Sequence, residues 1–397
     1  MSRITTLLAH SGDGQAEKIS RTYSSVPEVQ PVYMSSVFAF DDTQSVDDIY
    51  EGINDGYVYA RMKHPNNDAV SEILAKLDGA EAGLVFSSGM AAIITSIISV
   101  VSAGDHIVSS PVLYGGVRSY LENELKRFGV SVTFTDFSDV KNVEAAITPE
   151  TKLVYTETIS NPLMAVPDLP AIANVAHRHG ALFFVDNTFS PVVADPISYG
   201  ADVTLYSATK YLGGHSDLVA GAAVGRADII SGISKQLVLY GSVLGAAESW
   251  LLARSLRTLE LRVTKQSQNA LKIAQYLEKH PAINRVYYPG LESSPSHDTA
   301  KKLFTSGLYG GMLSADIRGG ADAASKVIDN LGFIKYVPSL AGTSTSVSYP
   351  ARTSPRSYSR SELEKEGITE GLLRFSAGIE DADDIISQLD RTLGVII

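Results

Sequence analysis

Ala181-Leu-Phe-Phe-Val-Asp186 decides the fold, because it is nearly all apolar and ends in an acid. A short apolar run of this kind is typical of a strand that is buried on both faces, as in parallel sheets. Similar runs alternate with helical patterns at 82–86, 106–109, 130–135, 152–157 and 201–206. This alternation predicts an α/β fold in which helices cover a mostly parallel sheet.

The chain has 397 residues, a length typical of two or three domains. The first sixty residues are irregular, and we expect 1–60 to be an N-terminal arm. The strongest boundary is a long helical pattern from Trp250 to about His280, after which strands and helices are mixed. We therefore expect an α/β domain at 61–255 and a smaller α+β domain at 256–397.

The composition excludes several classes of protein. With 44% hydrophobic and 19% charged residues, the chain is globular rather than disordered. Its net charge of -11 argues against binding nucleic acid through a broad basic face. It has no cysteine, which excludes disulfides, thiolate metal sites and a cysteine nucleophile. We predict no metal site.

The sequence also argues against a membrane protein. The most apolar run, 91–103, is interrupted by polar residues and is shorter than the roughly 20 residues that span a bilayer. The N-terminal residues carry acids and no long apolar core, so we expect no signal peptide. We expect a soluble, cytoplasmic protein.

Lys210 lies in Ser207-Ala-Thr-Lys210-Tyr-Leu-Gly-Gly-His-Ser-Asp217, directly after the predicted strand 201–206. Ligands bind at strand ends in α/β sheets, and the small neighbours of this lysine leave room for a bulky group. A partly desolvated lysine is an amine nucleophile for carbonyl compounds. The alternative is a solvated lysine in a polar loop, which is the usual case for a lone lysine.

Asp186 ends its predicted strand without a basic neighbour in the sequence. A buried acid is costly unless something pairs with it, so it either caps a helix or pairs with a protonated heterocycle. A lysine nucleophile together with such an acid is what pyridoxal phosphate (PLP) requires.

Ser87-Ser88-Gly89-Met90 lies between a predicted strand and a predicted helix. Backbone N–H groups at a helix N-terminus can bind an anion. Alone, the segment is an ordinary helix start. Together with Lys210 and Asp186 we interpret it as a phosphate cradle, to which Ser207 and Thr209 add hydroxyl groups.

Seven motifs together carry a family resemblance. They are Tyr59-Ala-Arg61, Ser87-Ser-Gly-Met90, Tyr114-Gly-Gly116, Glu157 with Ser160-Asn-Pro162, Val185-Asp-Asn-Thr188, the segment from Ser207 to His215, and Leu373-Arg-Phe-Ser-Ala-Gly-Ile-Glu380. With them, nearly the whole chain resembles the cysteine/methionine-metabolism (trans-sulfuration) family of PLP-dependent enzymes. That family includes cystathionine γ-lyase, cystathionine γ-synthase, cystathionine β-lyase, methionine γ-lyase and the O-acylhomoserine sulfhydrylases. The resemblance implies a fold type I PLP-dependent transferase, with a seven-stranded sheet in its larger domain.

The resemblance also implies catalytic and cofactor roles. Lys210 would form the Schiff base with PLP and move protons, and Asp186 would hold the pyridinium nitrogen. Tyr114 would stack on the cofactor ring and act as acid or base toward the leaving group. The cofactor phosphate site would consist of Ser88, Gly89, Met90, Ser207 and Thr209, with Tyr59 and Arg61 from a neighbouring subunit.

The substrate α-carboxylate would be bound by Asn161 and Arg374, with Ser339 beside it. The shared phosphate site implies a homotetramer that is built from two catalytic dimers. The implied partner is a small amino-acid substrate, with no nucleic acid and no membrane.

The sequence departs from the family at positions that bear on the substrate. Pro338 stands where cystathionine γ-lyases carry a glutamate, and Ser344 stands where an acid is usual. Both changes weaken the case for cystathionine. Gly116 stands where methionine γ-lyases typically show a cysteine. Arg352 and Arg356 add positive charge to a loop expected to border the substrate pocket, either as a solvated loop or to recognise an anionic group.

We therefore predict a PLP-dependent lyase that catalyses γ-elimination on a sulfur-containing amino acid such as methionine, homocysteine or cystathionine. The alternative is γ-replacement on an O-acylhomoserine, of the cystathionine γ-synthase or sulfhydrylase type, including a nonstandard nucleophile. A β-lyase is a third possibility. The segment Tyr211-Leu-Gly-Gly-His215 argues against a related aminotransferase, and the occupied catalytic positions argue against a non-catalytic cofactor-binding regulator.

Overall fold

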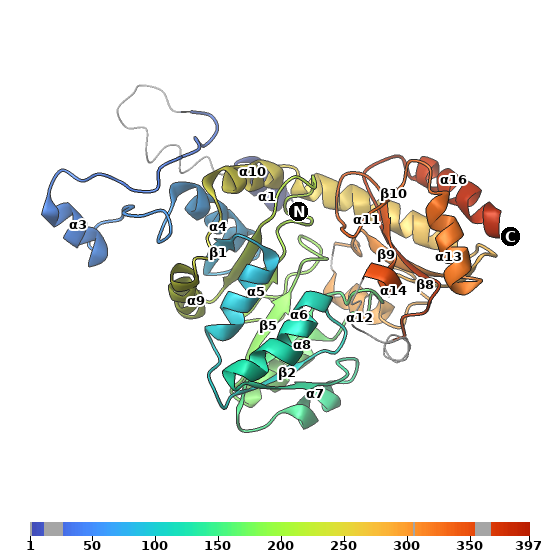
Figure 1. The fold of residues 1–397 in the computed structure, drawn as a ribbon, viewed down its shortest axis with the longest axis horizontal. Helices are drawn as coiled ribbons and strands as arrows, with labels where there is room; N and C mark the ends of the chain where they lie inside the picture. Colours follow the sequence, from blue (N-terminus) through green and yellow to red (C-terminus); the bar gives the residue numbers. More distant parts are fainter. Residues whose placement is uncertain (1, 12–26, 305, 354–366) are drawn as a thin grey trace.

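The computed structural model describes residues 2–11, 27–304, 306–353 and 367–397. Two β-sheets come from separate parts of the chain and lie beside each other (Figure 1). This arrangement confirms the predicted α/β fold with a second, smaller unit. The domain boundaries at 60/61 and 255/256 stay a prediction.

The larger sheet has seven strands in the order β1-β7-β6-β5-β4-β2-β3. Neighbouring strands from β3 to β6 run parallel, whereas β7 is antiparallel to both β1 and β6. The sheet is therefore mostly parallel, as predicted. Its strands are β1 (Ala82–Phe86), β2 (His106–Ser109), β3 (Ser131–Phe134), β4 (Thr151–Glu157), β5 (Leu182–Asp186), β6 (Val203–Tyr206) and β7 (Gly221–Gly225).

Helices cover both faces of this sheet because its strands carry apolar side chains on both faces, as β5 illustrates. Phe183 and Val185 point into one core cluster and Phe184 into the other, and all three side chains are fully buried. The first cluster packs against α4, α7 and α8, and the second against α5, α6 and α9. The helical segments here are α4 (Pro65–Leu77), α5 (Gly89–Ile98), α6 (Gly115–Ser119), η1 (Tyr120–Glu124), η2 (Leu125–Phe128), α7 (Val140–Ala146), α8 (Leu169–Arg178) and α9 (Ala227–Tyr240).

The single long helix expected after Trp250 is two helices, α10 (Ala246–Leu256) and α11 (Leu259–Leu277). They separate because the Thr258 hydroxyl bonds to the Ser255 carbonyl, while Arg262 donates to the same carbonyl from the next turn. The Ser255 carbonyl near the end of α10 thus takes side-chain donors instead of the N–H of a continuing helix. From there α11 runs to the smaller sheet, where it contacts β8, β9 and α16.

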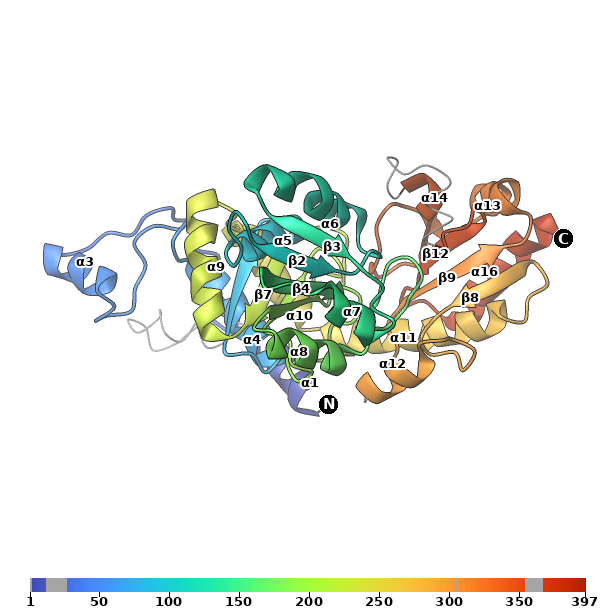
Figure 2. The same ribbon diagram turned by 90° about the horizontal axis from the view of Figure 1, so that it is seen from below.

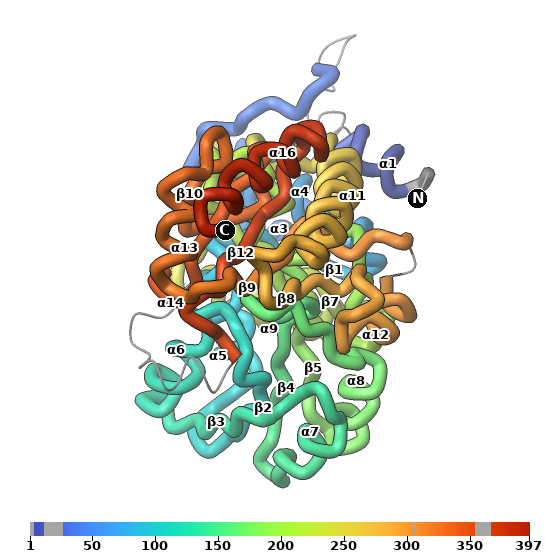
Figure 3. Tube along the Cα trace, turned by 90° about the vertical axis from the view of Figure 1, so that its right-hand side faces the viewer, coloured from blue at the N-terminus to red at the C-terminus, as the bar shows by residue number. Residues whose placement is uncertain are grey.

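The smaller sheet has five strands in the order β10-β11-β12-β9-β8, antiparallel except between β10 and β11. Apolar side chains of α11, α13 and α16 pack on it, and Figure 3 shows these helices side by side. The elements are β8 (Ile283–Tyr287), α12 (His297–Leu303), β9 (Met312–Ile317), α13 (Gly320–Asp329), β10 (Lys335–Tyr336), β11 (Ser346–Ser348), α14 (Pro350–Thr353), β12 (Leu372–Ser376), α16 (Ala382–Leu393) and η3 (Gly394–Ile396).

The N-terminal residues are less irregular than the sequence predicts. Helix α1 (Ser2–Ala9) packs on the body, with Leu8 fully buried in the core, because Ile4, Leu7 and Leu8 fall on one helical face. Residues 27–60, which we call the arm, extend away from the body and carry α3 (Thr43–Tyr50) at their far end (Figures 1 and 2).

The foot of the arm is fixed by buried polar contacts. The Gln30 side chain donates to the Pro65 carbonyl, and the Asn66 side chain donates to the Pro31 carbonyl. These bonds set the direction in which the arm leaves the body. Among the described residues, no helix is both long and apolar enough to cross a membrane.

Candidate active site

A cavity of about 460 Å³ lies where the carboxyl ends of β4, β5 and β6 face loops of the smaller domain. Ligands bind at this edge in α/β sheets. The cavity brings together most of the residues singled out in the sequence: Ser88, Gly89, Met90, Tyr114, Asn161, Asp186, Ser207, Thr209, Lys210 and Arg374. Glu157 and Thr188 also line it, and the sequence analysis quoted them in motifs without giving them a role. Lining residues that it did not mention are Ile93, Ile159, Phe189, Val219, Leu340 and Thr353.

Lys210 reaches into the cavity from the turn that follows β6. Its Nζ donates to the Oγ of Ser339, which belongs to the smaller domain, at 3.1 Å. Burial, and then the charge of Arg374, lower the pKa of the Lys210 amine. A larger fraction of the amine is therefore unprotonated at neutral pH, as a nucleophile or base requires.

Asp186 ends β5 at the floor of the cavity. One carboxylate oxygen accepts a hydrogen bond from the Thr188 backbone at 2.9 Å. Burial raises the pKa of this carboxyl to about 6. The described residues place no cationic side chain in an ion pair with it, so a protonated ring nitrogen in the cavity would supply the missing partner.

Glu157 ends β4 and lies directly beside Asp186 in the sheet register. Its Oε1 accepts a hydrogen bond from the Tyr114 backbone at 2.6 Å, which fixes the start of α6. Burial and the neighbouring Asp186 charge raise the pKa of Glu157 well above its ordinary value. The strand-end rule that drew attention to Asp186 also applies to Glu157, and could have identified it.

An anion cradle lies at the start of α5. Ser88 caps this helix, with its Oγ accepting from the Ala91 backbone at 3.0 Å. A Cβ on Gly89 would lie 2.7 Å from the Cβ of Ser207, so only glycine lets the helix start approach the end of β6 this closely. The first N–H groups of α5 thus face the cavity beside the Ser207 and Thr209 hydroxyls.

Arg374 and Asn161 form the opposite side of the cavity. Arg374 lies on β12, is almost fully buried, and donates from Nη1 to the Asn161 side-chain oxygen at 2.7 Å. Burial lowers the pKa of its guanidinium to about 10. Its Nε is buried without a hydrogen-bond partner among the described residues, which leaves a donor for a carboxylate.

Comparison with known proteins agrees with this geometry. Residues 5–394 match the family described as Cys/Met metabolism PLP-dependent enzymes. The chain belongs to this family. It is 40% identical over 371 residues to L-methionine gamma-lyase of Porphyromonas gingivalis, which covers 92% of each chain. It is 42% identical over 346 residues to cystathionine gamma-lyase of Bacillus subtilis, which covers 86% of this chain and 90% of the relative.

A solved structure from Campylobacter jejuni shares the fold. It is assigned as an O-acetylhomoserine (thiol)-lyase, superposes with a TM-score of 0.91 at 27% identity, and covers 98% of this chain and 99% of its own. It contains N'-pyridoxyl-lysine-5'-monophosphate. This chain is accordingly a PLP-dependent enzyme, and three features of its cavity fit PLP. They are the buried acid without a cation, the close-packed glycine cradle and the desolvated lysine.

Two of the sequence-predicted PLP contacts lie outside this cavity. Tyr59 and Arg61 are exposed at the base of the arm, with the Arg61 guanidinium 5.4 Å from the centre of the Tyr59 ring. Arg61 also donates from Nη1 to the Val238 carbonyl at 2.6 Å. Ser339 contacts Lys210 at the edge of the cavity.

The loop expected to border the substrate pocket does so through Pro338, Leu340 and Thr353, but the Arg352 side chain itself does not line the cavity. Its guanidinium lies over the Tyr349 ring at 5.4 Å and contacts Ser325 on α13 at 3.4 Å, while the next residue, Thr353, lines the cavity instead. The short helix α14 turns Arg352 toward α13. Arg356 lies outside the described residues.

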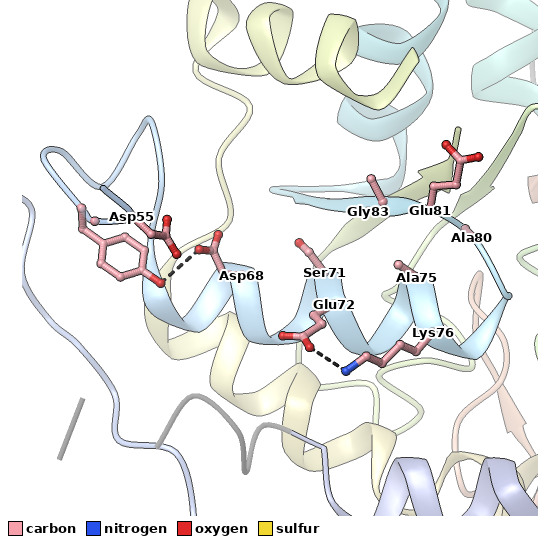
Figure 4. Close-up of a pocket in the computed structure, with 12 residues that line it drawn as sticks. Asp55, Asp68, Ser71, Glu72, Ala75, Lys76, Ala80, Glu81 and Gly83 are labelled. Carbon is pink, nitrogen blue, oxygen red and sulfur yellow. Dashed lines mark hydrogen bonds and ion pairs between the residues drawn. The ribbon is translucent and has the colours of Figure 1, made fainter. Parts of the chain in front are cut away.

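A larger hollow, about 620 Å³, lies between α4, β1 and the base of the arm (Figure 4). Lys76 there pairs with Glu72 at 2.6 Å, and the Asp68 carboxylate accepts from the Tyr57 hydroxyl at 3.0 Å. Its lysine is about half exposed and already paired, so it lacks the desolvated amine that PLP chemistry requires. We therefore place the active site in the smaller, more enclosed cavity.

Proposed function

We propose that the enzyme catalyses γ-elimination on a sulfur-containing amino acid, with L-methionine as the best candidate. Water would complete the reaction, and the products would be methanethiol, ammonia and 2-oxobutanoate. The observation that carries this proposal is the charge distribution of the cavity. Its charged lining residues are Glu157, Asp186, Lys210 and Arg374, and every other described lining residue is uncharged.

Each of the four charged residues would have a role in holding PLP, in binding the amino-acid end of the substrate, in moving its α-proton or in fixing Tyr114, which leaves none of them for the γ-substituent. Arg374 and Asn161 would bind the substrate carboxylate, and Asp186 would hold the PLP ring nitrogen. Bound PLP supplies an electron sink for the electron pair left at the substrate α-carbon. Lys210 would remove the α-proton, for which its lowered pKa suits it. Tyr114, held through its backbone by Glu157, would donate or accept a proton at the leaving group.

The remaining wall suits a small, neutral γ-substituent. Pro338, Leu340 and Thr353 line it from the smaller domain and Val219 from the larger one. Among the described residues this wall offers no charged partner for the distal ammonium and carboxylate of cystathionine. A thiomethyl group needs no such partner. This favours methionine or homocysteine over cystathionine.

We also propose that Tyr59 and Arg61 bind the PLP phosphate of a neighbouring subunit in a homotetramer. Both residues are exposed, and neither lines the cavity of its own chain. It also exposes large apolar side chains, including Met34 at 80% and Ile53 at 65%, which a second subunit would cover.

A second candidate is γ-replacement on an O-acylhomoserine. The Campylobacter jejuni structure, assigned as an O-acetylhomoserine (thiol)-lyase, favours it because its backbone matches almost the whole chain. Both reactions use the same residues up to loss of the γ-substituent. They differ in whether water or a thiol completes the turnover.

Product analysis by mass spectrometry separates these reactions. The purified holoenzyme is incubated with L-methionine, and in parallel with O-acetylhomoserine with and without a thiol. We expect 2-oxobutanoate, ammonia and methanethiol from methionine, and no thioether from O-acetylhomoserine. Accumulation of a thioether amino acid only when the thiol is present, with methionine untouched, would replace elimination with γ-replacement.

A further inference from the structure

One buried face of α11 is polar. Arg262, Gln266 and Asn269 are spaced four and three residues apart, so they lie on one side of the helix. Their exposed fractions are 5%, 0% and 1%. Buried polar side chains need hydrogen-bond partners, and those partners show what this face holds.

Arg262 binds the turn that carries Lys210. Its Nη1 donates to the Tyr211 carbonyl at 2.8 Å, and its Nη2 to the Ser255 carbonyl at 2.9 Å. Its Nε donates to the Thr258 hydroxyl at 3.1 Å. These acceptors are neutral, and burial without a carboxylate lowers the pKa of the guanidinium to about 10. A buried charge with only neutral partners contributes little net stability, so its hydrogen bonds to these carbonyls raise the question of what they position.

The lysine turn, residues 207–214, is shaped around this guanidinium. Gly214 has a φ of +69°, and a Cβ there would lie 1.8 Å from Nη1 of Arg262. The Gly214 N–H donates to the Lys210 carbonyl at 2.6 Å, which closes the turn. The backbone on the C-terminal side of Lys210 is thus fixed by Arg262 and by a glycine that makes room for it.

Gln266 binds the loop on the other side of the cavity. Its Nε2 donates to the Gly342 carbonyl at 2.8 Å. Ser339, three residues earlier, accepts from Nζ of Lys210 at 3.1 Å. Gly311 packs between the two halves, since a Cβ there would lie 2.8 Å from the Tyr211 hydroxyl and 3.0 Å from Cβ of Gln266.

We propose that Arg262 and Gln266 are positioning residues that set Lys210 against Ser339. Arg262 binds the Tyr211 carbonyl next to Lys210, and Gln266 binds the Gly342 carbonyl in the loop that carries Ser339. The two residues lie about one turn apart on the same rigid helix. They fix the distance across the cavity in this way. The proposal rests on the catalytic role proposed for Lys210, but not on which substrate is used.

Asn269 provides a matched control on the same face. Its side-chain nitrogen donates to the Gly378 carbonyl at 2.9 Å and to the Glu380 carbonyl at 2.8 Å. It is as buried as Gln266 and also binds backbone carbonyls, but neither the lysine turn nor the Ser339 loop is among these partners. Gln266→Ala and Asn269→Ala therefore remove similar bonds with different expected consequences.

The test compares Arg262→Lys, Gln266→Ala and Asn269→Ala as PLP-loaded enzymes. The pH titration of the visible absorbance of bound PLP reports ionisation at the lysine end of the site. We expect Arg262→Lys and Gln266→Ala to move its midpoint by about 0.5 pH unit or more. We also expect them to lower kcat about 10- to 100-fold with KM within about 3-fold, since small misplacements are costly in catalysis. Asn269→Ala should lower Tm only.

If all three variants lower Tm and none moves the titration midpoint, the face is merely structural and the proposal is wrong. If Arg262→Lys does not fold, the comparison of Gln266→Ala with Asn269→Ala decides. If the midpoint shifts in the variants but the wild-type enzyme converts neither methionine nor O-acetylhomoserine, the proposed function is wrong and the positioning role stands.

Discussion

The lysine turn and the base of the arm are both predicted to bind the same phosphate, yet they are built differently. In the turn, the Thr209 hydroxyl both donates to the Ala220 carbonyl at 3.2 Å and accepts from the Ala220 N–H at 3.0 Å. At the arm, Tyr59 is 40% exposed and Arg61 binds one carbonyl of α9. A single chain completes the first region, whereas the second would, under the proposal above, bind phosphate only together with another subunit.

We expect the largest effect from removing the Lys210 amine, the reactive group of the lysine turn. Lys210→Ala removes the proposed base, and we expect kcat with the active substrate to fall by more than about 100-fold. The exposed Lys235→Ala on α9 is the control and should turn over like the wild type. Steady-state kinetics with methionine checks both. A Lys210→Ala enzyme that kept wild-type turnover would refute the mechanism.

A buried acid, Asp78, contacts the end of β6, the strand that leads into the lysine turn. The Tyr206 hydroxyl, at the end of β6, donates to Asp78 at 2.5 Å, and burial raises the pKa of Asp78 to about 7. In the unfolded chain this carboxyl ionises near its ordinary pKa. Unfolding therefore releases a proton between about pH 4 and pH 7, and the free energy of unfolding falls as pH rises through this window.

Asp78→Asn keeps an acceptor for Tyr206 and removes the titration. The difference in free energy of unfolding between the variant and the wild type should rise by about 4 kcal/mol, in favour of the variant, from pH 4 to pH 8. This corresponds to the separation between the folded and unfolded pKa values of Asp78. Urea unfolding of the two proteins at both pH values measures this difference. Parallel pH profiles would mean that Asp78 ionises in the folded protein as it does in the unfolded chain.

On the arm side, Arg61→Ala should weaken PLP binding about 10- to 100-fold, the value of a charge-assisted hydrogen bond to phosphate. Lys63→Ala, two residues along, is the control cation, since it pairs with Asp55. Equilibrium dialysis against PLP gives both affinities. Equal affinities for the wild type and Arg61→Ala would remove Arg61 from the phosphate site.

Mixing two impaired variants tests whether Arg61 acts in the active site of a neighbouring subunit. If Arg61 acts across subunits, a mixture of Lys210→Ala and Arg61→Ala chains that is allowed to reassemble contains sites with both side chains intact. Activity should then rise above that of either variant alone. No recovery in a mixture shown to form hybrids would place Arg61 in its own chain's site.

The smallest effect is expected for Arg352→Ala. Because its side chain contacts Tyr349 and Ser325 instead of lining the cavity, KM and kcat should change less than about 2-fold. Kinetics with methionine and with an anionic co-substrate checks this. A rise in KM for the anionic compound alone would mean that Arg352 does contact a substrate in the pocket.

The sequence predicts the parts of the fold that have a local signal. The apolar run ending at Asp186 is β5, and its neighbours follow the same pattern. Strand β7, Gly-Ala-Ala-Val-Gly, escapes such reasoning because glycine and alanine have low strand propensity. Its small residues are required by packing, since a Cβ on Gly221 would lie 2.1 Å from the Ser88 carbonyl.

The same distinction applies to the candidate site. Lys210, Asp186 and Ser88 are predictable because each lies at a strand or helix end. Arg374 comes from the other sheet and Ser339 from the loop between β10 and β11, so residue patterns alone do not connect them to Lys210, and only the family resemblance pointed to them. The role of Glu157 needs the pairing of β4 with β5, which a single sequence does not state.

The placement of the cavity between two sheets has a consequence for how such enzymes diverge. Lys210, Asp186 and the phosphate cradle belong to the larger sheet, whereas Pro338, Leu340 and Thr353 belong to the smaller domain. Substitutions at Pro338, Leu340 or Thr353 can therefore alter the wall that faces the substrate side chain while Lys210 and its partner Ser339 stay in place. The two halves can vary independently as long as α11 keeps them in register.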